Sequence, residues 1–175
     1  YEAIAYCNKL SLKENLTPCY SVSGVTDWES LAYSSIPTSS NSTWNALTYD
    51  KEADGYRLPT EAEWEWLARG GENYTYAGSD TVGDVAWYAG NNDKGTIEVK
   101  TKQANGGNVR EWCYDWHGTV SSSTADTGAS SGSYRVLRGG CWYYSDSNCQ
   151  VSFRNYLSPR YRDFGSGFRV VRSAN

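Results

Sequence analysis

The hydrophobic positions of the chain follow a helical period at the N-terminus and lose any regular period soon afterwards. Within "YEAIAYCNKLSLKE" the apolar side chains on one helical face are Ala3, Ile4, Cys7 and Leu10. Their spacing predicts an amphipathic helix, and the Thr17-Pro18 pair would end it. From Cys19 to about Asp54, serine, threonine and asparagine are abundant. This composition favours weak strands and a long loop.

A second helix is predicted in "GYRLPTEAEWEWLARGG". Thr60 suits the N-cap and Glu63 follows three residues later, which is the spacing of a capping box. Acidic residues in the first turn and Arg69 in the last complement the helix dipole, and Gly70-Gly71 would end the helix. The apolar side chains on one face are Trp64, Leu67 and Ala68. We therefore expect this helix to pack in the core.

Strand patterns appear in the second half of the chain. "GNVREWCYDW" alternates between two faces, and "YRVLRGG" is a short strand that we expect to be buried on both sides. Between them, "SSSTADTGASSGS" is a surface loop by composition. "GFRVVR" reads as the last strand. Helices early, strands late and long loops between them favour an α+β domain over parallel βαβ units.

Length and composition favour one domain that spans residues 1–175 and has a real core. The mean hydropathy is low, −0.67, but 8 Trp and 15 Tyr supply bulky side chains for burial. The net charge of −4 disfavours nucleic acid as a partner, because phosphate binding needs a basic field. No stretch is apolar enough to cross a bilayer, so a membrane would be reached only through an anchor outside this chain. Arginines crowd the C-terminal third, and we expect them to pair with carboxylates and carbonyls.

The cysteine count is odd, so the chain cannot pair all of its cysteines internally. The five are Cys7, Cys19, Cys113, Cys141 and Cys149. Their spacing matches no zinc pattern, and the single histidine, His117, makes a zinc site improbable. The sequence leaves their disulfide state open.

Four blocks in a fixed order carry a family resemblance: "GYRLPTEAEWEWLARGG", "GNVREW", "RVLRGG" followed by Cys141-Trp142, and "GFRVVR". Together they resemble the formylglycine-generating-enzyme family. The resemblance implies an α+β, loop-rich C-type lectin fold of the sulfatase-modifying-factor type, with two helices around mixed antiparallel sheets. It covers nearly the whole chain.

In the oxidising enzymes of that family, a cysteine pair after the third block binds copper, a metal that soft thiolates select. Here Cys149 matches one member, but the other position holds a residue between Tyr143 and Ser145, and Cys141 lies too early. The resemblance thus implies that the catalytic centre is missing. Cys149 is then a buried thiol or a disulfide partner of a cysteine such as Cys7. An oxidase in which Cys141 and Cys149 meet in space stays the alternative.

The family also binds calcium near the second block, and Asn108 and Glu111 fall on that motif, with Arg110 in place of the usual tryptophan. The segment that normally precedes the motif is absent between Asn105 and Gly106. Either the chain lacks this segment or the sequence omits it. We therefore expect no metal and no cofactor.

The C-terminal third resembles, more narrowly, the variable proteins of diversity-generating retroelements, of the treponemal type built on the same scaffold. These keep a hypermutated segment between the third and fourth blocks, here about residues 141–169. In such systems randomised adenines change the first two bases of AAC codons. Such codons cannot yield Trp, Gln, Glu, Lys or Met. The candidate ligand-binding positions, none of which holds those five residues, are Tyr143, Tyr144, Ser145, Asp146, Ser147, Asn148, Phe153, Asn155, Tyr156, Leu157, Ser158, Arg160, Tyr161, Asp163, Phe164 and Gly165.

This mixture of tyrosine, serine and short polar residues is typical of an antibody paratope. Residues between the candidates would fix the backbone, among them Trp142, Arg154 and Phe168. The opposing interpretation is that the aromatic side chains are ordinary core, with Phe153 and Leu157 the first to be buried. Sugar binding is disfavoured, because the Glu-Pro-Asn and Trp-Asn-Asp motifs of sugar-binding lectins are absent.

The sequence thus predicts a non-catalytic, receptor-type variable protein that binds a macromolecule, a protein rather than a nucleic acid. We expect it at the cell surface or outside the cell, as a lipoprotein whose anchor is not in this chain. The formylglycine-generating-type oxidase remains the alternative function. The identity of the ligand and the oligomeric state lie beyond what the sequence indicates.

Overall fold

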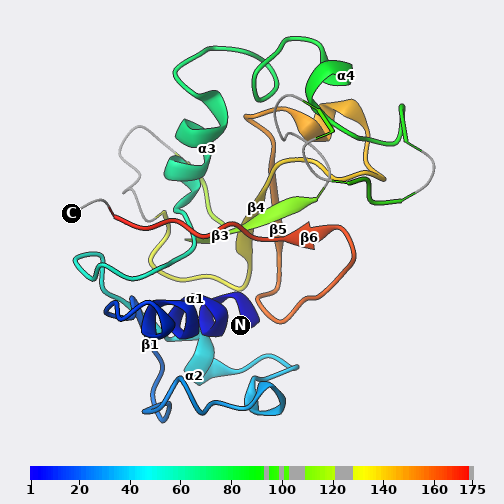
Figure 1. Ribbon diagram of the computed structural model, residues 1–175. Coiled ribbons are helices and arrows are strands. Elements are labelled where there is room, and N and C mark those ends of the chain that lie inside the picture. Colours follow the sequence, from blue (N-terminus) through cyan, green and yellow to red (C-terminus); the bar gives the residue numbers. More distant parts are fainter. Residues whose placement is uncertain (93–94, 99–100, 103–108, 121–127, 174–175) are drawn as a thin grey trace. The chain divides into compact units, whose positions relative to one another are not determined.

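The computed structural model describes residues 1–92, 95–98, 101–102, 109–120 and 128–173 (Figure 1). The chain forms two compact units. The first, here called the N-terminal unit, comprises Tyr1–Pro59, Ser158–Tyr161 and Arg169–Asn175. The second, the sheet unit, comprises Thr60–Leu157 and Arg162–Phe168.

The N-terminal unit is built around helix α1, Glu2–Lys13, which confirms the first predicted helix. Its inward face carries Ile4, Ala5 and Cys7, and the buried Asn8 amide bonds both the N–H and the carbonyl of Tyr20. A polar residue on the buried face thus ties the helix to the start of a strand and satisfies backbone groups there.

The rest of this unit is short elements and loops, as its composition predicts. Strands β1 (Tyr20–Ser21) and β2 (Thr48–Tyr49) pair antiparallel. A 3₁₀ turn, η1, spans Tyr33–Ser35, and a one-turn helix, α2, spans Ser42–Asn45. Trp44 on α2 packs edge-on against Trp28, with ring centres 5.9 Å apart.

In the sheet unit, helix α3 spans Glu61–Arg69 and has the predicted capping box between Thr60 and Glu63. Gly70 ends it in a left-handed conformation. Trp64 is buried and Ala68 packs beside it, but Leu67, predicted on the same face, is 43% exposed. That part of the prediction was wrong, because α3 meets the core along a stripe narrower than the sequence implies. A short helix, α4, follows at Val82–Val85.

Four strands form the sheet, in the order β5-β4-β3-β6 (Figure 1). They are β3 (Arg110–Trp116), β4 (Arg135–Arg138), β5 (Arg154–Leu157) and β6 (Ser166–Gly167). The β3–β4 and β4–β5 pairs are antiparallel, whereas β3–β6 is parallel. All of β4 is buried, as predicted. The core between sheet and helix contains Trp64, Ala77, Cys113, Val136 and Val151.

The predicted closing strand is much shorter than "GFRVVR" implies. Of the six residues predicted to form it, only Gly167 belongs to β6. Val171 makes an isolated bridge to Arg57 within the N-terminal unit. The α+β class is confirmed, with mixed pairing in the sheet.

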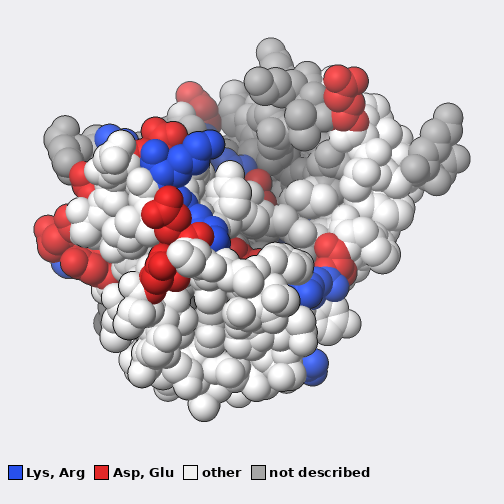
Figure 2. All heavy atoms as spheres, turned by 60° about the horizontal axis from the view of Figure 1, so that its bottom comes forward, with Lys and Arg blue, Asp and Glu red and all other residues white. Residues whose placement is uncertain are grey.

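Arginines of the sheet unit pair with acceptors inside the fold, as expected. Arg138, which is 1% exposed, contacts Glu61 at 2.6 Å and Glu65 at 2.7 Å, and Arg154 contacts Glu61 at 2.6 Å. On the face shown in Figure 2, basic side chains lie beside acidic ones instead of forming a basic field. Among the described helices, none combines the length and apolar character needed to span a bilayer.

Candidate ligand-binding surface

The candidate positions lie mostly at the protein surface. All of them except Gly165 are exposed or half-buried, and Phe153 and Leu157 are half-buried too. Ser158, Arg160 and Tyr161 belong to the N-terminal unit, and the other candidates belong to the sheet unit. The interpretation that these side chains are ordinary core therefore does not describe the structure.

Three candidate aromatic rings pack with a framework ring to form what we call the Trp142 cluster: Trp142, Tyr143, Tyr144 and Phe164. Tyr143 is its centre, with ring-centre distances of 5.0 Å to Trp142, 4.7 Å to Tyr144 and 5.4 Å to Phe164. Phe164 is 71% exposed. The cluster joins the loop after β4 to the loop before β6, and it offers an aromatic surface whose rings support one another.

Arg110, at the start of β3, forms hydrogen bonds to Tyr144 of this cluster and to its neighbours Asp163 and Ser166. Its guanidinium donates to the Tyr144 hydroxyl at 3.0 Å, to Asp163 Oδ2 at 2.6 Å and to Ser166 Oγ at 2.9 Å. Burial acts to lower the pKa of Arg110, but the charge of Asp163 and the nearby tyrosines outweigh it and raise that pKa. Arg110 is only 4% exposed. Two candidate positions, Tyr144 and Asp163, therefore supply hydrogen-bond acceptors to a buried cation.

Gly165 is buried, which argues against its direct contact with a ligand. A Cβ atom there would lie 2.5 Å from atoms of the Tyr143 ring. The missing side chain makes room for Tyr143, and the two positions are coupled in size.

Soon after Tyr144 in the chain, the 3₁₀ helix η2 (Asp146–Cys149) presents short polar side chains. Ser145, Asp146 and Ser147 are exposed, whereas Cys149 is 2% exposed and faces the interior. Ser145 Oγ lies 2.9 Å from Ser147 Oγ and donates to Asn148 Oδ1 at 2.8 Å. These side chains bond mainly to one another, so their replacement leaves the core contacts of Cys149 in place.

A second aromatic group, here called the Tyr134 cluster, comprises His117, Tyr134 and Tyr156. The Tyr156 ring centre lies 4.1 Å from that of His117 and 5.3 Å from that of Tyr134. Sequence reasoning missed His117 and Tyr134 as surface partners. A weak signal existed, since His117 directly follows one predicted strand and Tyr134 is the first residue of another.

The two aromatic clusters lie at opposite ends of β3. Arg110, under the Trp142 cluster, begins the strand, and His117 directly follows its end. Seven residues of extended chain span about 20 Å. Tyr156 therefore lies on a different surface from Tyr143, Tyr144 and Phe164.

Cys141 and Cys149 are the cysteines that the oxidase alternative would use. All five cysteines of the chain are free and buried, which agrees with the buried-thiol interpretation of Cys149. Burial and, secondarily, the neighbouring Cys141 raise the pKa of Cys149 to about 12, and burial also raises the pKa of Cys141. Copper would need both as thiolates, whereas burial favours the protonated thiols in the metal-free protein.

The proposed calcium motif gives no more support for a metal. Asn108 and the Asn105–Gly106 junction lie outside the described residues. Glu111 accepts a hydrogen bond from Trp64 Nε1 at 2.7 Å, so it braces α3 against β3. Within the described ranges, no group of three or more His, Cys, Asp or Glu side chains is placed to hold a metal ion.

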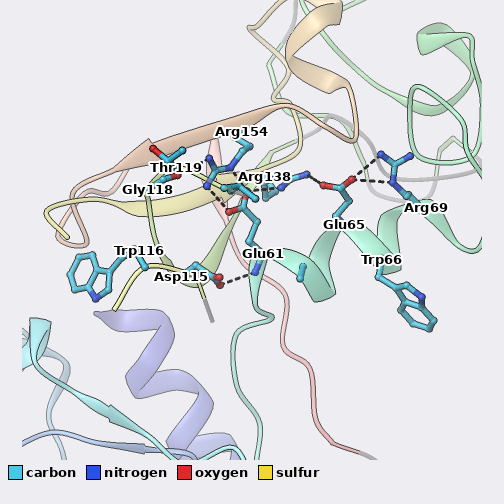
Figure 3. A pocket seen from close by; sticks show the side chains of 14 residues that line it. Glu61, Glu65, Trp66, Arg69, Asp115, Trp116, Gly118, Thr119, Arg138 and Arg154 are labelled. Atoms are coloured by element: carbon cyan, nitrogen blue, oxygen red, sulfur yellow. Dashed lines mark hydrogen bonds and ion pairs between the residues drawn. The ribbon is translucent and has the colours of Figure 1, made fainter. Parts of the chain in front are cut away.

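A cavity of about 470 Å³ opens beside α3, and the Glu61–Arg138–Arg154 ion pairs line it (Figure 3). Burial acts to raise the pKa of Glu61, but the hydrogen bonds and charges of Arg154 and Arg138 outweigh it and lower that pKa. The Glu61 N–H donates to Asp115 Oδ2 at 2.7 Å, yet burial raises the pKa of Asp115 to about 6. These ionic groups are engaged with one another, which is the arrangement of a structural network.

Comparison with known proteins places this geometry in a family. The model of the sulfatase-modifying factor enzyme 1-like domain matches residues 1–174. The solved structure of Treponema denticola variable protein 1 superimposes with a TM-score of 0.92 at 43% identity, covering 97% of this chain and 67% of that one.

Among curated relatives, the chaperone protein LppX of Paenibacillus barcinonensis is 36% identical, over 99% of this chain and 67% of its own length. The formylglycine-generating enzyme of Streptomyces coelicolor is 35% identical over 75% of this chain, which spans about half (51%) of that enzyme. Similar proteins thus include an enzyme and a variable protein. The chain belongs to the sulfatase-modifying factor enzyme 1-like family, with the C-type lectin fold of formylglycine-generating enzymes, and it resembles the treponemal variable proteins.

Proposed function

We propose that the chain is a non-catalytic variable protein, a single domain spanning residues 1–175, whose segment at about 141–169 binds a protein ligand. The observation that carries the proposal is the exposure of candidate side chains over a buried frame. Phe164 is 71% exposed while Val136 and Leu137 beneath the loops are 0% exposed. Side chains that face solvent can change with little effect on packing.

The chemistry of the exposed positions suits protein recognition. Tyrosine and phenylalanine rings supply large contact areas at low entropic cost, and serine, asparagine and aspartate adapt their hydrogen bonds. In the Trp142 cluster such rings lie next to the polar side chains of η2. A partner that covers both would gain aromatic burial at the centre and polar contacts at the rim.

The buried thiols support the non-catalytic part of the proposal. Cys141 and Cys149 are both almost fully buried with raised pKa values, so they stay protonated at neutral pH. We also propose that the protein acts at the cell surface or outside the cell, as a lipoprotein anchored through a segment outside this chain.

A display experiment tests the proposal. One library randomises Tyr143, Tyr144, Ser147 and Phe164, while Arg110, Asp163 and Gly165 stay fixed. A matched library randomises Tyr6, Lys9, Lys13 and Glu14, which lie on or next to α1 outside the candidate segment. Both are selected against lysozyme as an arbitrary protein target.

We expect folded binders from the first library, and far fewer from the second, because only the first set draws on the packed rings of the Trp142 cluster. The proposal fails if the first library loses folded protein as often as one randomised at Val136 and Leu137. It also fails if the two surface libraries yield binders equally.

A further inference from the structure

The Tyr134 cluster combines a candidate position with two residues outside the candidate segment. Tyr134 and Tyr156 are 48% and 47% exposed, and His117 is half-buried beneath them. The His117 N–H donates to the Tyr134 carbonyl at 2.8 Å, a backbone bond that joins the residue after β3 to the residue before β4. Tyr156 is paired with Val136 in the β4–β5 ladder, so backbone bonds hold the chain at all three residues, and only Tyr156 belongs to the set predicted to vary.

Two of the three rings are nearly stacked, and the third is tilted against them. His117 and Tyr156 lie 4.1 Å apart with an interplanar angle of 30°, close to an offset stack. Tyr134 is tilted by 56° against Tyr156. A planar group can extend such a stack by lying on the solvent side of the tyrosines.

The local electrostatics disfavour a cation at this place. Burial and then the nearby Arg154 lower the pKa of His117, with Glu61 acting weakly the other way. The positive charge of Arg154, which contributes to this lowering, would also repel an arginine or lysine side chain placed against His117. Arg154 itself is held by Glu61 and by the Gly118 carbonyl, at 2.9 Å from the latter. An uncharged planar group fits best.

We propose that the Tyr134 cluster is a second contact site, one that stacks an uncharged aromatic side chain of a protein partner. It rests on the proposed function in taking the partner to be a protein. His117 and Tyr134 lie outside the segment predicted to vary, so the site supplies a constant contact beside the variable positions. Tyr156, which lies in that segment, adjusts the specificity of the site.

The single histidine of the chain provides the test. NMR signals of the His117 imidazole are followed while N-acetyltryptophanamide, N-acetylargininamide or uridine monophosphate is added to the whole chain. We expect a saturable ring-current shift with the tryptophan compound and a weaker response to the arginine compound. Tyr134→Leu, which keeps an apolar side chain without an aromatic face, should weaken tryptophanamide binding about 10-fold.

Phe164→Ala is the matched control, because it removes an exposed ring from the Trp142 cluster and should leave the His117 response unchanged. If Tyr134→Leu does not fold, Tyr156→Ser replaces it as the test of the stack. The inference is overturned if tryptophanamide gives no saturable shift or if neither variant weakens it. A stronger response to the arginine compound or to uridine monophosphate also overturns it, the latter in favour of a nucleotide site.

The outcome separates this inference from the proposed function. The lysozyme libraries leave His117, Tyr134 and Tyr156 unchanged, and the NMR titration uses no selected binder. Binders without a His117 response would reject the second site alone. A His117 response without binders would reject the variable surface alone.

Discussion

Asp163 is a candidate variable position that the structure makes costly to change. Its carboxylate contacts the Arg110 guanidinium at 2.6 Å, and the two side chains are only 16% and 4% exposed. Its other oxygen accepts the Gly165 N–H at 2.9 Å. Asp163→Ala would leave a buried guanidinium without its counter-charge.

Removing one partner of a buried ion pair typically costs 3–5 kcal/mol. Arg110 keeps its bonds to Tyr144 and Ser166, so the lower end applies, about 3 kcal/mol or a roughly 150-fold shift toward the unfolded state. Asp163→Asn keeps an acceptor and should lose less. Asp146→Ala is the matched control, because Asp146 is an exposed aspartate of η2, and its replacement should change stability by less than about 0.5 kcal/mol.

Urea denaturation of the four proteins, followed by tryptophan fluorescence, measures these differences. The reasoning is refuted if Asp163→Ala and Asp146→Ala unfold at the same urea concentration. It is also refuted if Asp163→Asn is as unstable as Asp163→Ala, because the loss would then not depend on the acceptor.

Three further outcomes follow from the structure. Gly165→Ala should lose about 1–3 kcal/mol by crowding Tyr143, and Tyr143→Ser should restore much of it; a double-mutant cycle by urea denaturation that shows no coupling would contradict this. Because the folded-state pKa of Asp115 is raised to about 6, its ionisation destabilises the fold as pH rises through that value. Asp115→Asn should therefore gain up to about 3 kcal/mol relative to the parent above that pH, and a pH-independent difference in unfolding free energy would argue against it. Incubation with a sulfatase-type cysteine peptide, copper and oxygen should give no formylglycine by mass spectrometry, and turnover of the peptide would reject the non-catalytic proposal. In the same protein, Cys149 should resist thiol reagents until the protein unfolds.

Local sequence signals predicted the elements whose stability is local. The Thr60 cap, the Gly70 stop and the burial of β4 all follow from residue type and spacing. Leu67 was predicted to be buried but is exposed, because the helical period gives the direction of a side chain and not the width of the surface that covers the helix. Only Gly167 of the last predicted strand lies in β6, for a related reason, since pairing partners decide where an apolar run becomes a strand.

The site was predictable in composition but not in arrangement. Most of the candidate positions are at least partly exposed, but Gly165 is buried and Phe168, predicted as framework, is exposed. The sequence also did not indicate that Tyr156 and the Trp142 cluster lie at opposite ends of β3. The hydrogen bonds from Arg110 to Tyr144 and Asp163 also could not be read from the sequence, because they join residues that meet only in the folded chain. The same holds for the fit of Tyr143 over Gly165. Side-chain exchange is thus less independent than the sequence alone implies.

Sequencing the coding region of residues 141–169 from many sibling cells tests the central claim most directly. The account predicts differences concentrated at exposed candidate positions such as Ser147, Tyr156 and Phe164, and rare at Trp142 and Arg154. Where position 163 changes, the new residue should keep a hydrogen-bond acceptor for Arg110. Identical sequences in every cell, or changes spread evenly over framework and candidate positions, would contradict it.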